Sequence, residues 1–332
     1  MTTSFLHRET KQTADIAVAQ LQNSLFYISI ADHVRGRDIK MVYLLGRGSS
    51  YHAAHYSKYL IETSLGLPCC IGALASQSVF QSGLKLANTL VIAFSQSGES
   101  PDIIETVVAA KSAGAFCIAA VNQSQSPLAK LCHEQLPIMA GDEHSVAASK
   151  SYLASLLAIT RLCALLSEDH ALIVAIDKIN TALVKQNDKC YQGLALPEAL
   201  KHGSGIILGR GFGHAMAGEM ALKIQEVLGR HVQAISSAEF MHGPFTLIYN
   251  DVLMLELSVD DLSQKHHSAV IDRINAEGKA VYSFERTENR YHPLINNILT
   301  MHMFYLNLDQ TAQHWGRNPD APQGLQKITK TH

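Results

Sequence analysis

The sequence contains an internal repeat at one fixed offset. The tetrapeptide LGRG begins at residue 45 and again at residue 208, an offset of 163 residues. The same offset aligns Ala54 with Ala217, Leu65–Gly66 with Leu228–Gly229, and Ala75 with Ala238. These identities at a single offset indicate a duplicated domain, because solenoid repeats have periods of only about 20–50 residues.

Short apolar runs alternate with helix-like stretches in each half of the repeat. In the first half the pattern predicts strands at 41–45, 89–94 and 116–121, and helices at 13–34, 51–65, 103–112 and 146–166. Nearly all-apolar strands that alternate with helices are typical of a parallel sheet covered on both faces. The sequence therefore predicts an α/β fold of two tandem domains, each a parallel sheet flanked by helices on both faces in three layers.

The domain boundary is expected near residues 168–190, a stretch that resembles a linking helix. We expect an N-terminal helix and the first domain at 1–168, and the linking helix and the second domain at 169–309. The residues from 310 to 332 have the glycine, proline and polar composition of an irregular tail.

Charge and composition exclude several classes of protein. The formal net charge is −2, and no basic block or stripe is present, so nucleic acid and acidic membrane surfaces are not expected partners. The apolar stretch at 152–166 is interrupted by Arg161 and too short to span a bilayer. The six cysteines include no CxxC pair and lie mostly in apolar stretches, as in reduced cytoplasmic proteins.

The 17 histidines raise the question of a metal site. His52 and His55 have helical spacing, and His266 and His267 are adjacent, but neither pair has a nearby third ligand in a known pattern. We therefore expect neither a metal nor another cofactor.

The segment SQSGES at 95–100 follows an apolar strand and leads into a helix that begins with Pro101. Ligands collect at the loops that follow parallel strands, and a helix N-terminus favours an anion such as phosphate. The donors available in these loops are Ser95, Gln96, Ser97 and Ser100, with Ser49 and Ser50 in the neighbouring loop. The alternative is a serine-capped helix that binds nothing, but the combination with GRGSS favours phosphate.

The repeat differs at this segment. The offset places FSQSG at 94–98 opposite LSVDD at 257–261, so two aspartates replace Ser97 and Gly98. Carboxylates at these positions would repel the ligand that the first half binds. The two halves are therefore expected to have specialised, the first for binding and the second for chemistry.

The helix after the second GRG carries three charged residues at i, i+4 and i+7. Glu219, Lys223 and Glu226 share one helical face, which could be only a solvated surface ion pair. His242 follows shortly afterwards, just before a Gly243–Pro244 turn. A carboxylate and a histidine on a turn could act as base and acid in proton transfer at a carbon next to a carbonyl.

Several of these motifs together resemble the sugar-isomerase (SIS) family, and in particular the paired SIS domains of the isomerase half of glucosamine-6-phosphate synthase. The motifs are GSSY at 48–51, SQSGE at 95–99, VAASK at 146–150, EMALKIQE at 219–226, EFMHGP at 239–244 and PQGLQK at 322–327. The sequence begins without the MCGI start of the glutaminase half, so we expect no glutaminase domain. It is most similar to the free-standing SIS-type glucosamine-6-phosphate deaminases.

The resemblance implies a role for each matching residue. Phosphate binding falls to Ser50, Ser95, Gln96, Ser97 and Ser100, and contacts with sugar hydroxyls to Ser49 and the backbone around Val146. Glu226 would move the proton between C1 and C2 with support from Glu219 and Lys223, and Lys327 would lie beside the carbonyl or imine carbon. His242 would open the sugar ring from the partner subunit of a homodimer with shared active sites.

Three functions remain open at this point. The first is deamination and isomerisation of glucosamine 6-phosphate to fructose 6-phosphate and ammonia. The second is a deglycase that releases an amino acid from a fructosamine 6-phosphate. The third is a non-catalytic phosphosugar sensor, which would not need Glu226, His242 and Lys327. Ala148 and Phe240–Met241 depart from the synthase pattern and leave the sugar's stereochemistry and the amine undetermined.

Overall fold

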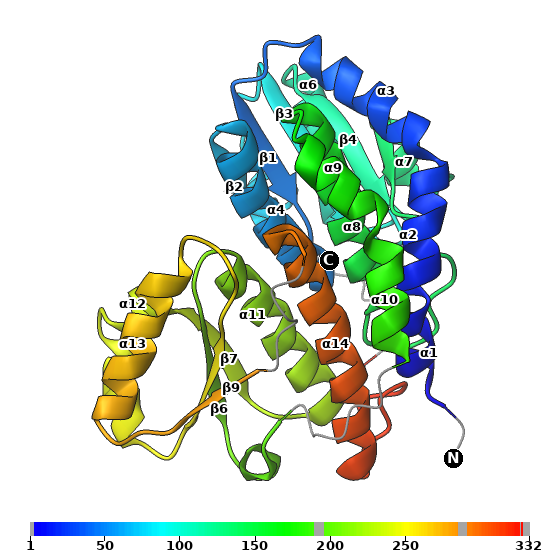
Figure 1. The fold of residues 1–332 in the computed structure, drawn as a ribbon. Coiled ribbons are helices and arrows are strands. Elements are labelled where there is room, and N and C mark those ends of the chain that lie inside the picture. Colours follow the sequence, from blue (N-terminus) through cyan, green and yellow to red (C-terminus); the bar gives the residue numbers. More distant parts are fainter. Residues whose placement is uncertain (1–2, 189–195, 285–290, 326, 328–332) are drawn as a thin grey trace. The chain divides into compact units, whose positions relative to one another are not determined.

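The computed structural model describes residues 3–188, 196–284, 291–325 and 327 (Figure 1). The chain divides into two compact units, each built around one parallel sheet. The five-stranded unit contains Thr13–Glu143 and Lys150–Asn180. The four-stranded unit contains Met1–Gln12, His144–Ser149 and Thr181–Lys327, so it draws on three separate segments of the chain.

The five-stranded unit has the strand order β2-β1-β3-β4-β5, with every neighbouring pair parallel. Its strands are β1 (Met41–Leu45), β2 (Cys69–Ile71), β3 (Thr89–Ser95), β4 (Phe116–Val121) and β5 (Glu134–Pro137). Its helices are α2 (Thr13–Gln22), α3 (Ser24–Arg35), α4 (Ser49–Leu65), α5 (Leu74–Ser78), α6 (Pro101–Ser112), α7 (Pro127–Leu131), α8 (Lys150–Leu166) and α9 (His170–Asp177).

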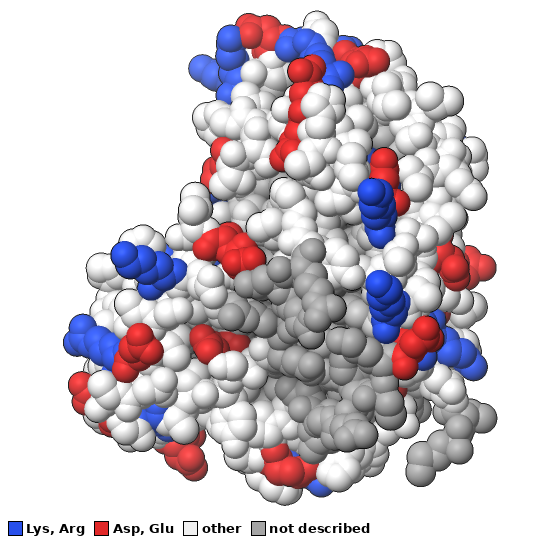
Figure 2. All heavy atoms as spheres, in the orientation of Figure 1, with Lys and Arg blue, Asp and Glu red and all other residues white. Residues whose placement is uncertain are grey.

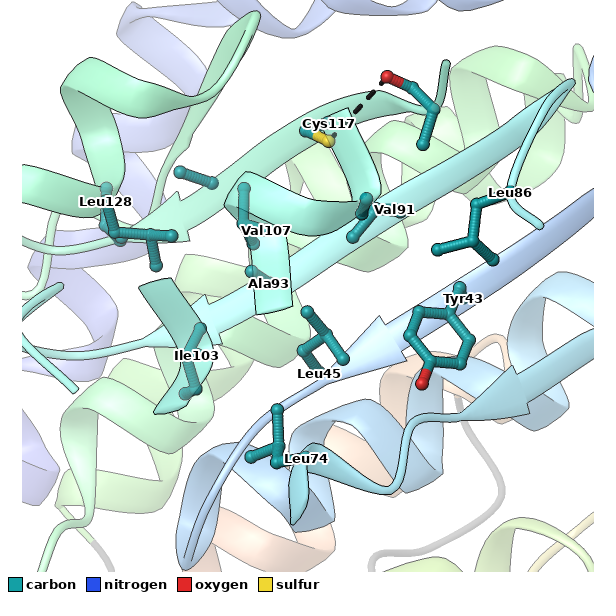
Figure 3. Close-up of a cluster of buried hydrophobic side chains, with 14 of the residues drawn as sticks. Tyr43, Leu45, Leu74, Leu86, Val91, Ala93, Ile103, Val107, Cys117 and Leu128 are labelled. Atoms are coloured by element: carbon teal, nitrogen blue, oxygen red, sulfur yellow. Dashed lines mark hydrogen bonds between the residues drawn. The ribbon is translucent and has the colours of Figure 1, made fainter. Parts of the chain in front are cut away.

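Helices cover both faces of this sheet. Figure 3 shows one face, where Val91 and Cys117 on the strands pack against Ile103 and Val107 of α6. Helices α4 and α8 pack against each other and contact the sheet strands without joining this cluster. Strands β3 and β4 are buried at every position, as their nearly all-apolar sequences predict.

The four-stranded unit has the strand order β7-β6-β8-β9, again with parallel neighbours. Its strands are β6 (Gly205–Gly209), β7 (Val232–Ser236), β8 (Leu253–Leu257) and β9 (Val281–Ser283). Its helices and helical turns are α1 (Phe5–Lys11), η1 (Glu198–Lys201), α11 (Phe212–Lys223), η2 (Ile224–Leu228), α12 (Ser237–Phe240), η3 (Pro244–Tyr249), α13 (Gln264–Ala276) and α14 (Pro293–His314). Helix α10 (Ile179–Asn187) contains the point where the chain passes between the units.

The two sheets repeat the same local design. In each, the first strand of the repeat pairs with the second on one side and with the third on the other. Gly48 and Gly211 occupy matching N-cap positions with φ 52°, ψ −130° and φ 54°, ψ −126°. Such positive φ values favour glycine, so the same backbone conformation explains the last glycine of GRG in both halves. Parallel sheets flanked by helices confirm the predicted three-layer α/β fold.

Several predicted element boundaries are wrong. The single helix expected at 13–34 is two helices, α2 and α3, separated at Asn23. The helix expected from Val146 begins only at Lys150, because residues 144–149 belong to the other unit. The irregular tail expected from Gln310 begins later, since α14 continues to His314. Periodicity did not identify these breaks because they follow from tertiary contacts.

The surface agrees with the composition. Figure 2 shows both signs of charge interspersed on the face drawn, with wide uncharged areas between them. No described helix is long and apolar enough to cross a membrane. Each described cysteine is a free thiol, and burial raises the pKa of Cys69 to about 12 and that of Cys117 to about 11. Cys190 lies outside the described residues.

Candidate active site

The predicted phosphate-binding loops lie side by side in the five-stranded unit. Strand β1 leads into α4 through GRG, and its neighbour β3 leads into α6 through SQSGES. Ser49 and Ser50 are the first two residues of α4, and Ser95 is the last residue of β3. Because β1 and β3 are parallel neighbours, both loops leave the same edge of the sheet. The structure therefore brings the six predicted phosphate-loop residues to one edge; we call these two loops the cup.

Hydrogen bonds within the SQSGES loop fix its shape. The hydroxyl of Ser95 accepts from the backbone N–H of Gly98 at 3.0 Å, and that of Ser97 accepts from Glu99 at 3.3 Å. Gly98 has φ +67°, and an added Cβ would lie 2.1 Å from Oγ of Ser126. Ser126 in turn caps α7 by accepting from Ala129. Gly98 is thus required both by its backbone conformation and by its close approach to Ser126.

The N-terminus of α6 is partly occupied by its own residues. Pro101 has no N–H, and the N–H of Ile103 donates to Oδ1 of Asp102 at 2.9 Å. The side chain of the N-cap residue Ser100 makes no capping bond in the structure. The N-terminus of α6 therefore offers a bound anion fewer free backbone N–H groups than the sequence suggested. Binding of an anion would depend more on the serine hydroxyls and on the Gln96 amide.

A charged pair joins the first loop of the cup to the first turn of α6. Arg47, between the two glycines of the first GRG, donates from Nε and Nη2 to Oδ2 of Asp102 at 2.8 and 2.7 Å. Asp102 is almost fully buried in the first turn of α6. Neither residue was singled out from the sequence, because their 55-residue separation leaves no local signal.

The corresponding edge of the four-stranded unit carries acidic side chains. Oδ1 of Asp261 accepts from the N–H of Ser263 at 2.7 Å. Oδ2 of Asp261 lies 3.6 Å from where a Cβ on Gly211 would lie. A carboxylate thus occupies the position beside the second GRG, as expected from the SVDD sequence.

The predicted proton-transfer residues form a charged cluster on α11 and the turn that follows it. Lys223 forms an ion pair with Glu226 and lies 3.8 Å from Oε1 of Glu219. Glu219 and Lys223 are buried, whereas 23% of the Glu226 side chain is exposed. The buried lysine therefore has carboxylate partners, as a buried charge requires.

The chain does not continue as an ordinary helix through this cluster. Helix α11 ends at Lys223, and Ile224–Leu228 form a π-helical turn. The expected uninterrupted α-helical register from Glu219 to Glu226 is therefore wrong, although all three charges still meet. π-Turns are common at functional sites because they rotate a side chain out of the α-helical register.

Tyr305 supports this cluster from α14. Its hydroxyl donates to Oε1 of Glu219 at 2.7 Å, and both side chains are fully buried. Sequence pattern does not predict a role for this tyrosine, because it lies among the apolar residues of a long helix.

His242 is exposed on the turn after α12, with its backbone N–H bonded to the carbonyl of Glu239 at 3.0 Å. The next residue, Gly243, has φ 146° and leads into the helical turn η3 at Pro244. Burial lowers the pKa of nearby His214, while the charge of Glu239 opposes that shift. An exposed imidazole on a turn is available to a ligand or to another molecule.

The tail residue Lys327 contacts the segment at 144–149. Its Nζ donates to the carbonyl of Ser145 at 2.6 Å, and the N–H of Val146 donates to the carbonyl of Asp320 at 3.2 Å. Glu9 of α1 accepts from the N–H of Ser145 at 3.2 Å. The predicted residues Val146 and Lys327 therefore belong to one assembly, which also includes Glu9 and Asp320.

The predicted site residues divide between the units. The residues assigned to phosphate binding, together with Ser49, lie in the five-stranded unit. The residues assigned to proton transfer on α11 and η2, together with Val146, His242 and Lys327, lie in the four-stranded unit. Within the described part of the chain, no three His, Cys, Asp or Glu side chains gather where they could hold a metal ion.

Comparisons with known proteins place these features in a family. The SIS domain profile matches residues 37–165, which include both loops of the cup. The chain is 30% identical to a protein assigned as a phosphosugar isomerase in Silicibacter pomeroyi DSS-3, with a TM-score of 0.87 over 96% of this chain and 100% of that chain. The profile covers only the first repeat, so a second SIS domain remains a prediction.

Two further similar proteins have named activities. The isomerizing glutamine–fructose-6-phosphate aminotransferase of Clostridium acetobutylicum is 28% identical over 87% of this chain and 52% of its own length. The chain thus spans about half the length of the curated relatives it matches. The glucosamine-6-phosphate deaminase of Thermotoga maritima shares the fold, with a TM-score of 0.73 at 19% identity over 99% of this chain and 100% of that chain.

Proposed function

This chain belongs to the SIS-domain family of phosphosugar isomerases, and we propose that it converts glucosamine 6-phosphate and water to fructose 6-phosphate and ammonia. The proposal depends above all on the Lys223–Glu226 ion pair. Glu226 is partly exposed, while Lys223 and Glu219 behind it are buried. A phosphosugar sensor would need the cup but has no use for such a charged set.

In this reaction Glu226 removes the proton from C2 of the open-chain sugar and returns a proton to C1. The C2 amine thereby becomes an imine, which water hydrolyses to the ketone and ammonia. Lys223 orients Glu226 through their ion pair, and Glu219 lies 3.8 Å from the same ammonium group. His242 of the partner subunit in a homodimer opens the ring, and Lys327 lies beside the reacting carbon.

The cup supports a phosphorylated substrate. The hydroxyls of Ser50, Ser97 and Ser100 and the amide of Gln96 donate to the phosphate oxygens. Ser49 and the backbone at Val146 bind sugar hydroxyls. The aspartates of the second half favour a single phosphate site per chain.

The test is product analysis in deuterated water with glucosamine 6-phosphate, other 6-phosphorylated amino sugars and fructosamine 6-phosphates. We expect ammonia and fructose 6-phosphate in equal amounts from glucosamine 6-phosphate, with deuterium at C1 of the product. Faster release of an amino acid from a fructosamine 6-phosphate would instead favour the deglycase. Binding of phosphosugars without turnover of any would favour the sensor.

A further inference from the structure

The Arg47–Asp102 pair links the first loop of the cup to the first turn of α6, which follows the second loop. Both bonds from Arg47 end on the same oxygen, Oδ2, while Oδ1 of Asp102 accepts from Ile103 within its own helix. Asp102 is thus held in one orientation by two different elements. Its side chain is 8% exposed, whereas that of Arg47 is 53% exposed.

The position of Asp102 creates an electrostatic conflict for an anion-binding loop. An aspartate in the first turn stabilises a helix through the helix dipole. The same carboxylate lies two residues after Ser100, so its charge would repel a bound phosphate. Low exposure makes this repulsion stronger than it would be in water, because the local dielectric constant is lower.

Arg47 removes the conflict by pairing with the carboxylate. We propose that Arg47 is a positioning residue of the cup, which neutralises Asp102 and holds the two loops in register so that the cup accepts a phosphate dianion. This role rests on the proposed phosphosugar function and adds to it a residue outside the serine-rich motifs.

The repeat gives independent support. The second half keeps the arginine, as Arg210, but the position equivalent to Asp102 is Lys265. The charge pair is therefore specific to the half that carries the SQSGES loop. The second half, with Asp261 beside its GRG, therefore places a lysine where the first half has Asp102, and LSVDD where the first half has FSQSG.

The role is tested by measuring the affinity for fructose 6-phosphate calorimetrically, with unphosphorylated fructose as reference. Arg47→Ala should weaken fructose 6-phosphate binding by about 10–100-fold, because it leaves Asp102 unbalanced. Asp102→Asn should change the affinity by less than about threefold, because it removes the repulsive charge itself. The double variant should recover most of the affinity that Arg47→Ala loses.

The matched control is Arg35→Ala, which removes an exposed Arg–Asp pair of 2.8 Å from the same unit. Wild-type affinity in Arg47→Ala would overturn the role of Arg47. Equal weakening of binding by Asp102→Asn and Arg47→Ala would mean that the pair only tethers the loop to the helix. That result would also overturn the proposed role of Arg47 in neutralising Asp102. If the wild-type protein bound fructose 6-phosphate no better than fructose, the proposed function itself would fail, so the two failures are distinguishable.

Discussion

The hydroxyl of Tyr305 donates a hydrogen bond to Oε1 of Glu219 across 86 positions of sequence. Because both residues are fully buried, Tyr305→Phe leaves a buried carboxylate oxygen without this donor. We expect the free energy of unfolding to fall by about 1–3 kcal/mol. We expect kcat to fall about tenfold with little change in KM, since Glu219 supports Lys223 rather than the phosphate.

Urea unfolding and steady-state kinetics would measure both effects of Tyr305→Phe. Tyr282→Phe is the control, because Tyr282 is an exposed tyrosine of the same unit. Unchanged stability together with unchanged kcat would show that the hydrogen bond has no role in the cluster.

Glu226→Gln should lower kcat by at least roughly a hundredfold, the usual scale for loss of a general base, with KM nearly unchanged. The amide keeps the shape of the side chain but cannot take a proton from C2. Glu277→Gln is the matched control, because Glu277 is an exposed carboxylate whose Oε2 accepts from the Tyr249 hydroxyl at 2.9 Å, away from the cluster. Persistent deuterium exchange at C2 in the Glu226 variant would place the base elsewhere.

Gly98→Ala should both destabilise the protein and weaken phosphosugar binding. The substitution adds a Cβ 2.1 Å from Oγ of Ser126 at a residue with positive φ. Gly141 is the control, since it has φ +65° but no atom within 4 Å of its added Cβ. We expect a loss of about 1 kcal/mol for Gly141→Ala and about 2–4 kcal/mol for Gly98→Ala, measured by urea unfolding. Equal losses of stability in the two variants would mean that the Ser126 side chain moves away from the added methyl group at no energetic cost.

Mixing two inactive variants tests whether His242 acts across a dimer interface. If it does, a heterodimer of Glu226→Gln and His242→Ala subunits has one site with both lesions and one site with neither. Subunit exchange at equal ratio should then restore roughly a quarter of wild-type activity. No restoration after verified exchange would mean that His242 acts within its own chain or has no role.

His302 makes stability depend on pH. Its pKa is lowered to about 3, chiefly by burial and to a smaller extent by the charges of Lys11 and His7, while a hydrogen bond with the Thr10 backbone opposes the shift. The unfolded chain, with an ordinary histidine pKa near 6.5, therefore binds a proton more readily than the folded chain. This contribution to stability is complete above about pH 6.5 and is lost as the pH falls towards 3.

At pH 5 the loss attributable to His302 should be about 2 kcal/mol relative to pH 7.5. His302→Gln should reduce the pH dependence of unfolding by that amount, because glutamine does not titrate. An unchanged slope of stability against pH in the variant would show that His302 is protonated equally in both states.

The parts of the fold that follow from local pattern were predictable. Strand β1 and strand β4 begin and end where their apolar runs do, and the 163-residue repeat reappears as matching strand order and matching backbone angles at Gly48 and Gly211. The neighbouring positions of the two cup loops follow from adjacent parallel strands. The roles of the individual cup residues stay predictions.

What local pattern cannot encode is the identity of distant partners. Periodicity shows which face of a helix is buried, but not which atom lies opposite. Glu9 was not identified as a partner of the 144–149 segment, nor was Asp102 as a partner of Arg47, because their hydrogen bonds join residues 55 to 136 positions apart. The π-turn at Ile224–Leu228 was not predicted either, because its sequence IQEVL contains no glycine or proline that would mark a break in the helix.

The sequence by itself therefore determined the α/β architecture, the duplication and the chemistry available at each loop, because these depend on residue type and short-range spacing. The tertiary structure decided that residues 144–149 join the tail and α1, that α14 supplies Tyr305, and that Asp102 is neutralised from the neighbouring loop. The physical reason is that a buried charge or hydroxyl is stable only with a partner, and the chain fold alone determines which partner is near.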